Sequence, residues 1–224
     1  MELFIENYDV ITELEDAFDE EWASFEDSWG TRLAQELDDA TRIEDTEIPN
    51  EYVAVSLPVG DEQRQWTFRQ GKSDWSWVFP REWWTQLDER RPVSDATKPN
   101  ARVGFVHRLD WHRDEAVRDQ TLIVYLRNAP SGHDTFYDGF ANRFAEAASE
   151  VRPAIADTNY TMTGNKSNVL RGEYDISVDA HESFFDAYIH TLAQAVTEAA
   201  LTNPDLVEII DRAYTETIEE DVSL

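Results

Sequence analysis

The stretch "YVAVSLPVGDEQRQWTFRQGKSDWSWVF" (residues 52–79) decides the fold that the sequence predicts. It consists of short apolar runs, rich in β-branched and aromatic residues, that are separated by the turn signals "GDEQ" and "GK". Runs of this kind are typical of strands joined by tight turns. We therefore predict three successive strands of one sheet, at 52–59, 64–70 and 74–79.

Three more segments have the same character. They predict strands at 101–111, 120–128 and 169–179. The strand at 120–128 is apolar nearly throughout, which indicates a central position in the sheet. Between the last two of these strands, the apolar residues recur at the spacing of a helix. The predicted buried side of this helix consists of Phe136, Phe140 and Phe144.

The ends of the chain have helical patterns. Between residues 9 and 29, acids fill the positions between apolar residues at three- and four-residue spacing. These apolar residues are Ile11, Leu14, Phe18, Trp22, Phe25 and Trp29. Gly30 is predicted to break or bend this helix, because glycine is a poor helix former, and a second helical piece follows at 31–40. Two further helices are predicted at 179–203 and 204–220.

This order of elements predicts an α+β fold. We expect a largely antiparallel sheet of about six strands, with an N-terminal helical pair, one intervening helix and two C-terminal helices. A chain of 224 residues has the length of one domain. Residues 1–224 are therefore expected to form a single domain, with an N-terminal helical segment (1–43), a sheet-containing core (51–178) and C-terminal helices (180–220).

Acidic residues dominate the composition. There are 47 Asp and Glu against 19 Lys and Arg, which gives a formal net charge of −28, and only three of the bases are lysines. In ordinary salt this charge destabilises the compact state, whereas in molar salt the Debye length shrinks to about 3 Å and the repulsion is screened. An acid-coated, lysine-poor chain resembles the cytosolic proteins of haloarchaea. This resemblance implies a surface that holds salt ions and a hydration shell.

The sequence also indicates the compartment. No apolar run approaches the ~20 residues that span a bilayer, and the start "MELFIENYDV" carries acids where a signal peptide carries bases. The chain has no cysteine, which excludes disulfides and thiolate metal sites. We therefore expect a cytoplasmic protein that does not contact a membrane.

A group of bases and tryptophans marks a candidate binding surface. Bases interleaved with aromatic rings are suited to stacking on nucleobases or sugars. Trp75, Trp77 and Phe79 share one strand face and are expected in the core, whereas Trp83 and Trp84 follow as a rim. The predicted binding residues are Arg69, Lys72, Arg81, Trp83, Trp84 and Arg108. In the alternative interpretation, these arginines only pair with the surrounding acids.

The segment "HRLDWHRDEAVRD" (107–119) is the densest polar group and a candidate metal or general-base site. Imidazole and carboxylate are ligands for zinc and for harder divalent ions. The candidate ligands are His107, Asp110, His112 and Asp114. The alternative is a charged loop that joins two strands. No cofactor other than such a divalent metal is predicted.

Two familiar motifs are incomplete. The "GKS" at 71–73 lacks the earlier glycine of a phosphate-binding loop, because Trp66 stands in that position, and a strand follows where a helix is required. The aromatic strands and the aromatic helix between residues 60 and 200 resemble accessory α+β domains of the PD-(D/E)XK nuclease superfamily. The catalytic pattern of those nucleases is absent, since none of the three lysines has an acid two positions before it.

These observations lead to three hypotheses. The first is a non-enzymatic binding or accessory protein of a halophilic cytoplasm, associated with DNA processing or defence as the nuclease resemblance implies, whose partner is a protein or a nucleic acid. The second is a metal-dependent hydrolase, acting on phosphodiesters, that uses the cluster at 107–115. The third is an acidic DNA mimic that inhibits a basic partner.

Overall fold

The computed structural model of the chain describes residues 8–43, 52–69, 76–83, 103–108, 113–129 and 134–222. Within these residues, eight strands form one antiparallel sheet in the order β1-β2-β3-β4-β5-β6-β8-β7. The strands are β1 (Thr41–Ile43), β2 (Tyr52–Val59), β3 (Glu62–Arg69), β4 (Ser76–Pro80), β5 (Val103–His107), β6 (Thr121–Asn128), β7 (Tyr160–Met162) and β8 (Asn168–Asp175). The predicted α+β class is therefore confirmed.

The stretch at 52–79 forms the predicted antiparallel strands. β2 and β3 pair along their full length, from Tyr52 opposite Arg69 to Val59 opposite Glu62. Gly60 takes a positive φ of 60° in the turn between them, a conformation that costs glycine little. β4 then pairs with β3 and with β5, so the sheet continues in chain order.

The prediction of about six strands is wrong, because it misses both edges of the sheet. β1 and β7 have three residues each, which is too short to show a two-residue period in the sequence. Both are edge strands. Short edge strands limit the unpaired backbone that a sheet offers to other chains.

The N-terminal helical pair is also wrong, since one helix, α2 (Tyr8–Glu36), runs through Gly30. A glycine costs a helix interior only about 1 kcal/mol, and the buried Trp29 and Leu33 on either side of Gly30 outweigh that cost. The other predicted helices are present. They are α5 (Asp134–Glu146), which continues as α6 (Ala148–Ala154), and α7 (Phe184–Val196) and α8 (Pro204–Val222), with short helices α4 (Arg113–Arg118), η1 (Val178–Ala180) and η2 (Thr197–Leu201).

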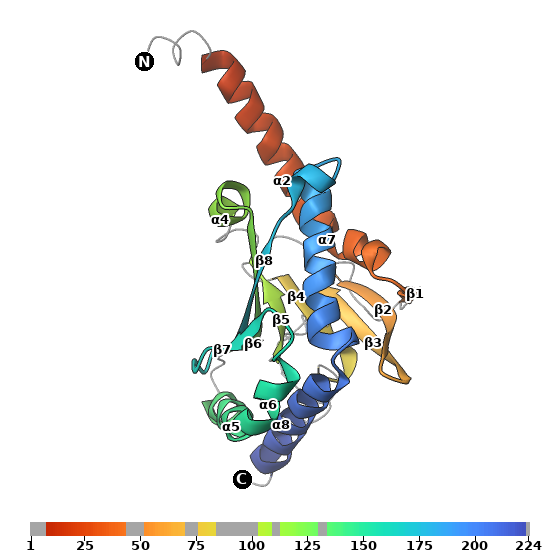
Figure 1. The fold of residues 1–224 in the computed structure, drawn as a ribbon, viewed down its shortest axis with the longest axis vertical. Coiled ribbons are helices and arrows are strands. Elements are labelled where there is room, and N and C mark those ends of the chain that lie inside the picture. The colour runs from red at the N-terminus through yellow and green to blue at the C-terminus, as the bar shows by residue number, and fades with distance from the viewer. Residues whose placement is uncertain are drawn as a thin grey trace.

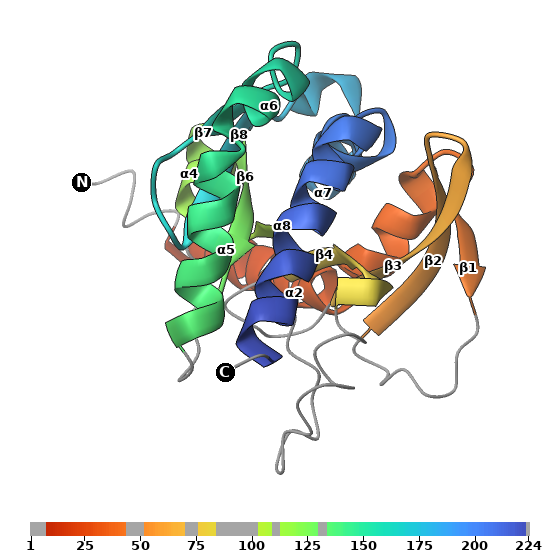
Figure 2. The same cartoon turned by 90° about the horizontal axis from the view of Figure 1, so that it is seen from below.

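The main helices pack on one face of the sheet. Trp29 of α2 stacks on Phe68 of β3, Tyr188 of α7 reaches His107 of β5, and Phe136 of α5 packs edge-on against Tyr214 of α8. Figure 1 shows α7 in front of the sheet, with α8 and α5 together toward the C-terminus. In Figure 2, α7 and α8 lie between the β1–β3 side and the β6–β8 side of the curved sheet.

The centre of the sheet is buried on both faces. Every residue of β4 and β5 is buried, although alternate residues of a strand point to opposite sides. Trp77 and Phe79 are buried as predicted, and so are Ser76 and Val78 on the helix-covered side. Trp75 lies outside the described residues. The buried apolar side chains of the sheet and the helices form one continuous core.

None of the helices that the structure describes is long and apolar enough to cross a membrane.

Candidate functional site

Trp83, a predicted surface contact, belongs to the core, so this prediction is wrong. Only 1% of Trp83 is exposed. Its indole Nε1 donates a hydrogen bond of 2.5 Å to Oδ1 of Asp211 on α8, and its ring stacks on Tyr214 with centroids 6.0 Å apart. The other rim residues, Lys72 and Trp84, lie outside the described parts of the chain.

The arginines near this rim are bound to acids or aromatic rings. Arg64 of β3 forms two hydrogen bonds of 2.7 Å with Asp211 and a weaker one with Glu82. Burial opposes the charge of Arg64, but these acids outweigh that cost and raise its pKa. Arg69 lies over the ring of Tyr52 at 6.0 Å, and Arg81 is half-buried. Arg64 thus pairs with acids, in the way that the alternative interpretation expects of the arginines near it.

The predicted binding residue Arg108 directly follows β5, and the neighbouring strand β6 carries Arg127. Arg108 is only 6% exposed. The pKa of Arg127, which is half-buried, is lowered by burial and then by the charge of Arg108, so the two cations lie near each other. The predicted binding residue Arg108 is thus brought beside another arginine, in a buried environment rather than on an open surface.

The structure describes the backbone of two of the predicted metal ligands, His107 and Asp114, and places them on different elements, β5 and α4. His107 is fully buried: its Nδ1 is 2.9 Å from the hydroxyl of Tyr188, and its ring meets Trp29 edge-on at 4.6 Å. Burial lowers the pKa of His107 to about 3. Asp110 and His112 lie outside the described residues, and Asp114 lies on α4. Within the described ranges, no three His, Asp or Glu side chains form a group that would hold a metal.

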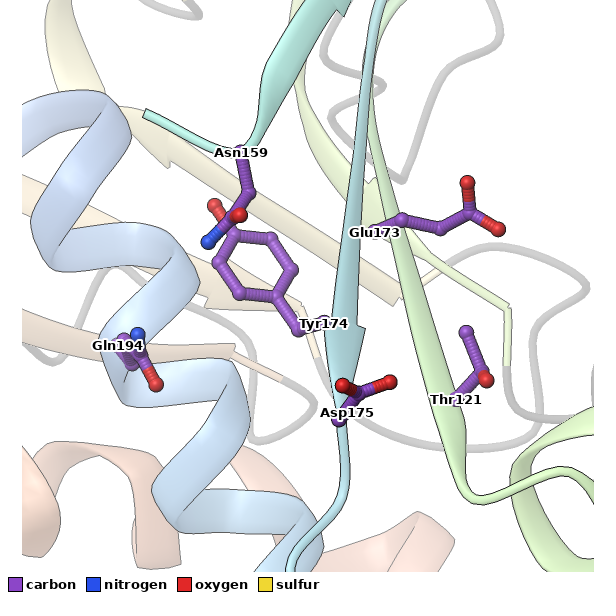
Figure 3. Close-up of a pocket in the computed structure, with 6 residues that line it drawn as sticks. All are labelled: Thr121, Asn159, Glu173, Tyr174, Asp175 and Gln194. Carbon is purple, nitrogen blue, oxygen red and sulfur yellow. The ribbon is translucent and has the colours of Figure 1, made fainter. Parts of the chain in front are cut away.

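A surface depression that the sequence did not reveal lies beside β8. Its volume is about 350 Å³, and it is lined by Thr121, Asn159, Glu173, Tyr174, Asp175 and Gln194. Figure 3 shows Tyr174 and Asn159 together on one side of β8, whereas Glu173 points to the other side. The lining is thus divided between two sides of a strand and does not converge on one point.

Glu198 of η2 organises one side of this depression. Its carboxylate accepts hydrogen bonds from the backbone N–H of Asn159, the hydroxyl of Tyr174 and Nε2 of Gln194. Burial raises the pKa of Tyr174, which keeps this hydroxyl a donor. These contacts join η2 to β8 and to the start of β7, so we interpret Glu198 as a structural group.

The N-terminal half of α2 is different, because it extends beyond the rest of the protein (Figure 1). Val10 is 54% exposed and Leu14 is 66% exposed, although Leu14 belongs to the apolar side that the sequence pattern predicts for this helix. Phe18 is half-buried, and Trp22 is the first buried residue among the side chains of this helix that the structure describes. We call Val10, Leu14 and Phe18, which recur every four residues on one side of the helix, the α2 stripe.

An arginine of the same chain contacts this helix through both its charge and its flat guanidinium group. Arg113 of α4 forms an ion pair with Asp19. Its guanidinium lies 5.0 Å from the ring of Phe18 and 5.1 Å from that of Trp22. A guanidinium over an aromatic face is attracted by the ring as well as by the carboxylate. Within the chain, this part of α2 therefore holds the guanidinium of Arg113 by both charge and ring contact.

Comparison of the chain with family models, with curated proteins and with solved structures found no match in any of the three.

Proposed function

We propose that this chain is a non-enzymatic binding protein whose partner docks along the projecting half of α2. The observation that supports this most directly is the exposure of Val10 and Leu14 on a helix that extends away from the core. Isolated helical segments of about 14 residues are marginal in water. A partner that covers the α2 stripe would bury its apolar side chains and stabilise the helix.

The charge of this helix specifies the chemistry of the partner. Residues 8–21 contain seven acids and no base. These acids are Asp9, Glu13, Glu15, Asp16, Asp19, Glu20 and Glu21. A partner helix with apolar residues on one side and arginines at its margins would match both features, because helices often dock as an apolar stripe framed by complementary charges. The contacts of Arg113 provide a pattern for each such arginine.

The same charge argues against two other occupants. Nucleic acid gains most of its affinity from phosphate contacts with bases, and residues 8–21 offer none. A second copy of the chain would place seven acids against seven more, and like charges across an interface oppose association. Basic segments are common in proteins that handle nucleic acids, which is compatible with an accessory role in DNA processing or defence.

A peptide-binding experiment tests this proposal. The probe is a synthetic amphipathic peptide with leucines and arginines at helical spacing, and its binding is measured by fluorescence anisotropy in the salt at which the chain is folded. Leu14→Ser should weaken binding at least about tenfold, because a buried leucine contributes roughly 1.5–3 kcal/mol. Thr12→Ala is the matched control, since residue 12 lies about 160° away around the helix, and it should leave binding unchanged.

Three outcomes would count against the proposal. Equal binding by the Leu14→Ser and Thr12→Ala variants would show that the α2 stripe is not the docking surface. If both variants bind the peptide as tightly as the wild-type chain, but binding is lost as salt rises, the DNA-mimic hypothesis is favoured. The reason is that salt screens a purely ionic contact. A dimer in analytical ultracentrifugation that Leu14→Ser converts to a monomer would identify a second copy as the occupant.

The halophilic habitat is a separate proposal with its own test. We expect the far-ultraviolet circular dichroism of the folded chain to be lost when potassium chloride is lowered from molar to millimolar concentration. The reason is that 47 acids against 19 bases repel one another once the Debye length exceeds about 10 Å. A chain that keeps its full signal in millimolar salt would contradict this proposal and would favour an acidic DNA mimic.

A further inference from the structure

We infer that His181 and His190 form a binding site for a transition-metal ion of the zinc, copper and nickel class. Their ring centroids lie 4.8 Å apart with the planes tilted by 43°. His190 lies on α7, and His181 follows η1 directly. The segment between them folds back on α7, so two residues nine positions apart meet on one surface.

The distance between the two imidazole rings is compatible with one metal ion bound by both. Imidazole nitrogens bind zinc at about 2.0–2.1 Å, and a tetrahedral angle then places two of them roughly 3.3 Å apart. Rings with centroids at 4.8 Å bring their nitrogens to such a distance by rotation about the side-chain bonds. The side chain of His190 is 56% exposed and His181 is half-buried, so an ion has access to both.

Glu36 at the end of α2 determines which nitrogen of His190 is free to bind a metal. Nδ1 of His190 is 2.7 Å from Oε1 of Glu36. A carboxylate accepts hydrogen bonds only, so Nδ1 carries the proton and the lone pair remains on Nε2. A histidine that donates its other N–H to a carboxylate is the usual arrangement around bound zinc, since it fixes the ring and strengthens the ligand.

The charge of the protein favours a bound cation, but the two histidines fill only part of the coordination shell of a metal ion. The net charge of −28 attracts cations to the protein as a whole. Two imidazoles with water in the remaining positions select borderline and softer ions over magnesium and calcium, which prefer oxygen ligands. This inference is independent of the docking of a partner on α2.

Titration calorimetry with zinc chloride tests the site on the folded full-length chain. We expect one zinc ion to bind per chain, and magnesium chloride to give no heat of binding. His190→Gln and His181→Gln should each weaken zinc binding at least tenfold. Glu36→Ala should weaken it by about 10–100-fold, which is the usual effect of losing an outer carboxylate.

Asp38→Asn is the matched control, because it removes a nearby exposed acid that contacts neither ring in the described structure, and its zinc affinity should equal that of the wild-type chain. Cobalt provides a second measurement, since its visible absorption should change with the wild-type chain and not with His190→Gln. The inference is overturned if the wild-type chain binds no zinc, or if the two histidine variants bind it as well as the Asp38→Asn control.

Discussion

Replacing Asp211 with alanine should lower the free energy of unfolding by about 3 kcal/mol. Asp211 accepts two hydrogen bonds of 2.7 Å from Arg64 and one from the indole of Trp83. The side chain of Arg64 is only 15% exposed, so the variant leaves a buried cation without its main partner. We expect a loss at the low end of the range for buried pairs, because the side chain of Asp211 is 36% exposed and water screens part of the interaction.

The position of this cluster explains why a single carboxylate has such an effect. Arg64 belongs to β3, Trp83 follows β4, and Asp211 lies on α8. The hydroxyl of Tyr214, one helical turn after Asp211, donates to the backbone carbonyl of Trp83. The cluster thus fixes the C-terminal helix to the strands that the stretch at 52–79 forms.

Denaturant unfolding at constant potassium chloride measures this effect. Asp211→Asn keeps an oxygen for Trp83 but loses the charge, so its loss of stability should be smaller than that of Asp211→Ala. Glu208→Ala, an exposed position one turn earlier on α8, should change stability by less than about 0.5 kcal/mol. If Asp211→Ala unfolds at the same denaturant concentration as Glu208→Ala, the cluster does not stabilise the fold.

The local part of the fold was predictable from the sequence. The strands at 52–79 carry their own turn signals, and Phe136, Phe140 and Phe144 show a helical period. These three residues stack in sequence along α5. Both features depend on neighbours in the chain, which is the information that residue periodicity contains.

The contacts of the candidate sites were not predictable, because they depend on residues far apart in the chain. Trp83 and Asp211 are separated by 128 positions. The residues around Trp83 in the chain therefore do not indicate that its indole is buried against a distant helix and bonded to a carboxylate there. His190 and Glu36 are separated by 154 positions. Periodicity identified an apolar side of α2, but it does not tell a buried side from one that projects beyond the core. Leu14 therefore looked like a core residue.

Acid should destabilise the protein through His107. Burial lowers the pKa of His107 to about 3, whereas an unfolded chain holds histidine near its ordinary pKa of about 6.5. Between these two values the unfolded chain binds a proton at residue 107 and the folded chain does not. The free energy of unfolding therefore falls as pH drops through this window, by about 1.4 kcal/mol per pH unit. Above about pH 6.5, His107 is neutral in both states and this loss of stability is absent.

The surroundings of His107 give the physical reason for this low pKa. Nδ1 lies 2.9 Å from the hydroxyl of Tyr188, and Nε2 is buried with no hydrogen-bond partner among the described residues. The neighbouring rings of Trp29 and Tyr188 carry no negative charge. An imidazolium here would thus be desolvated without a carboxylate to compensate, which is the condition that disfavours the charged form.

The comparison of His107→Gln with the wild-type chain isolates this effect. Glutamine is neutral at every pH and can still reach the hydroxyl of Tyr188. The interval between about pH 6.5 and pH 5 lies above the usual pKa range of carboxylates. Over this interval, the free energy of unfolding should fall by about 2 kcal/mol more in the wild-type chain than in the variant. His190→Gln, at an exposed position, should keep the wild-type slope. Equal slopes for the wild-type and His107→Gln chains would mean that His107 takes up its proton in the folded state, and hence that the packing of Trp29 and Tyr188 around it opens in acid.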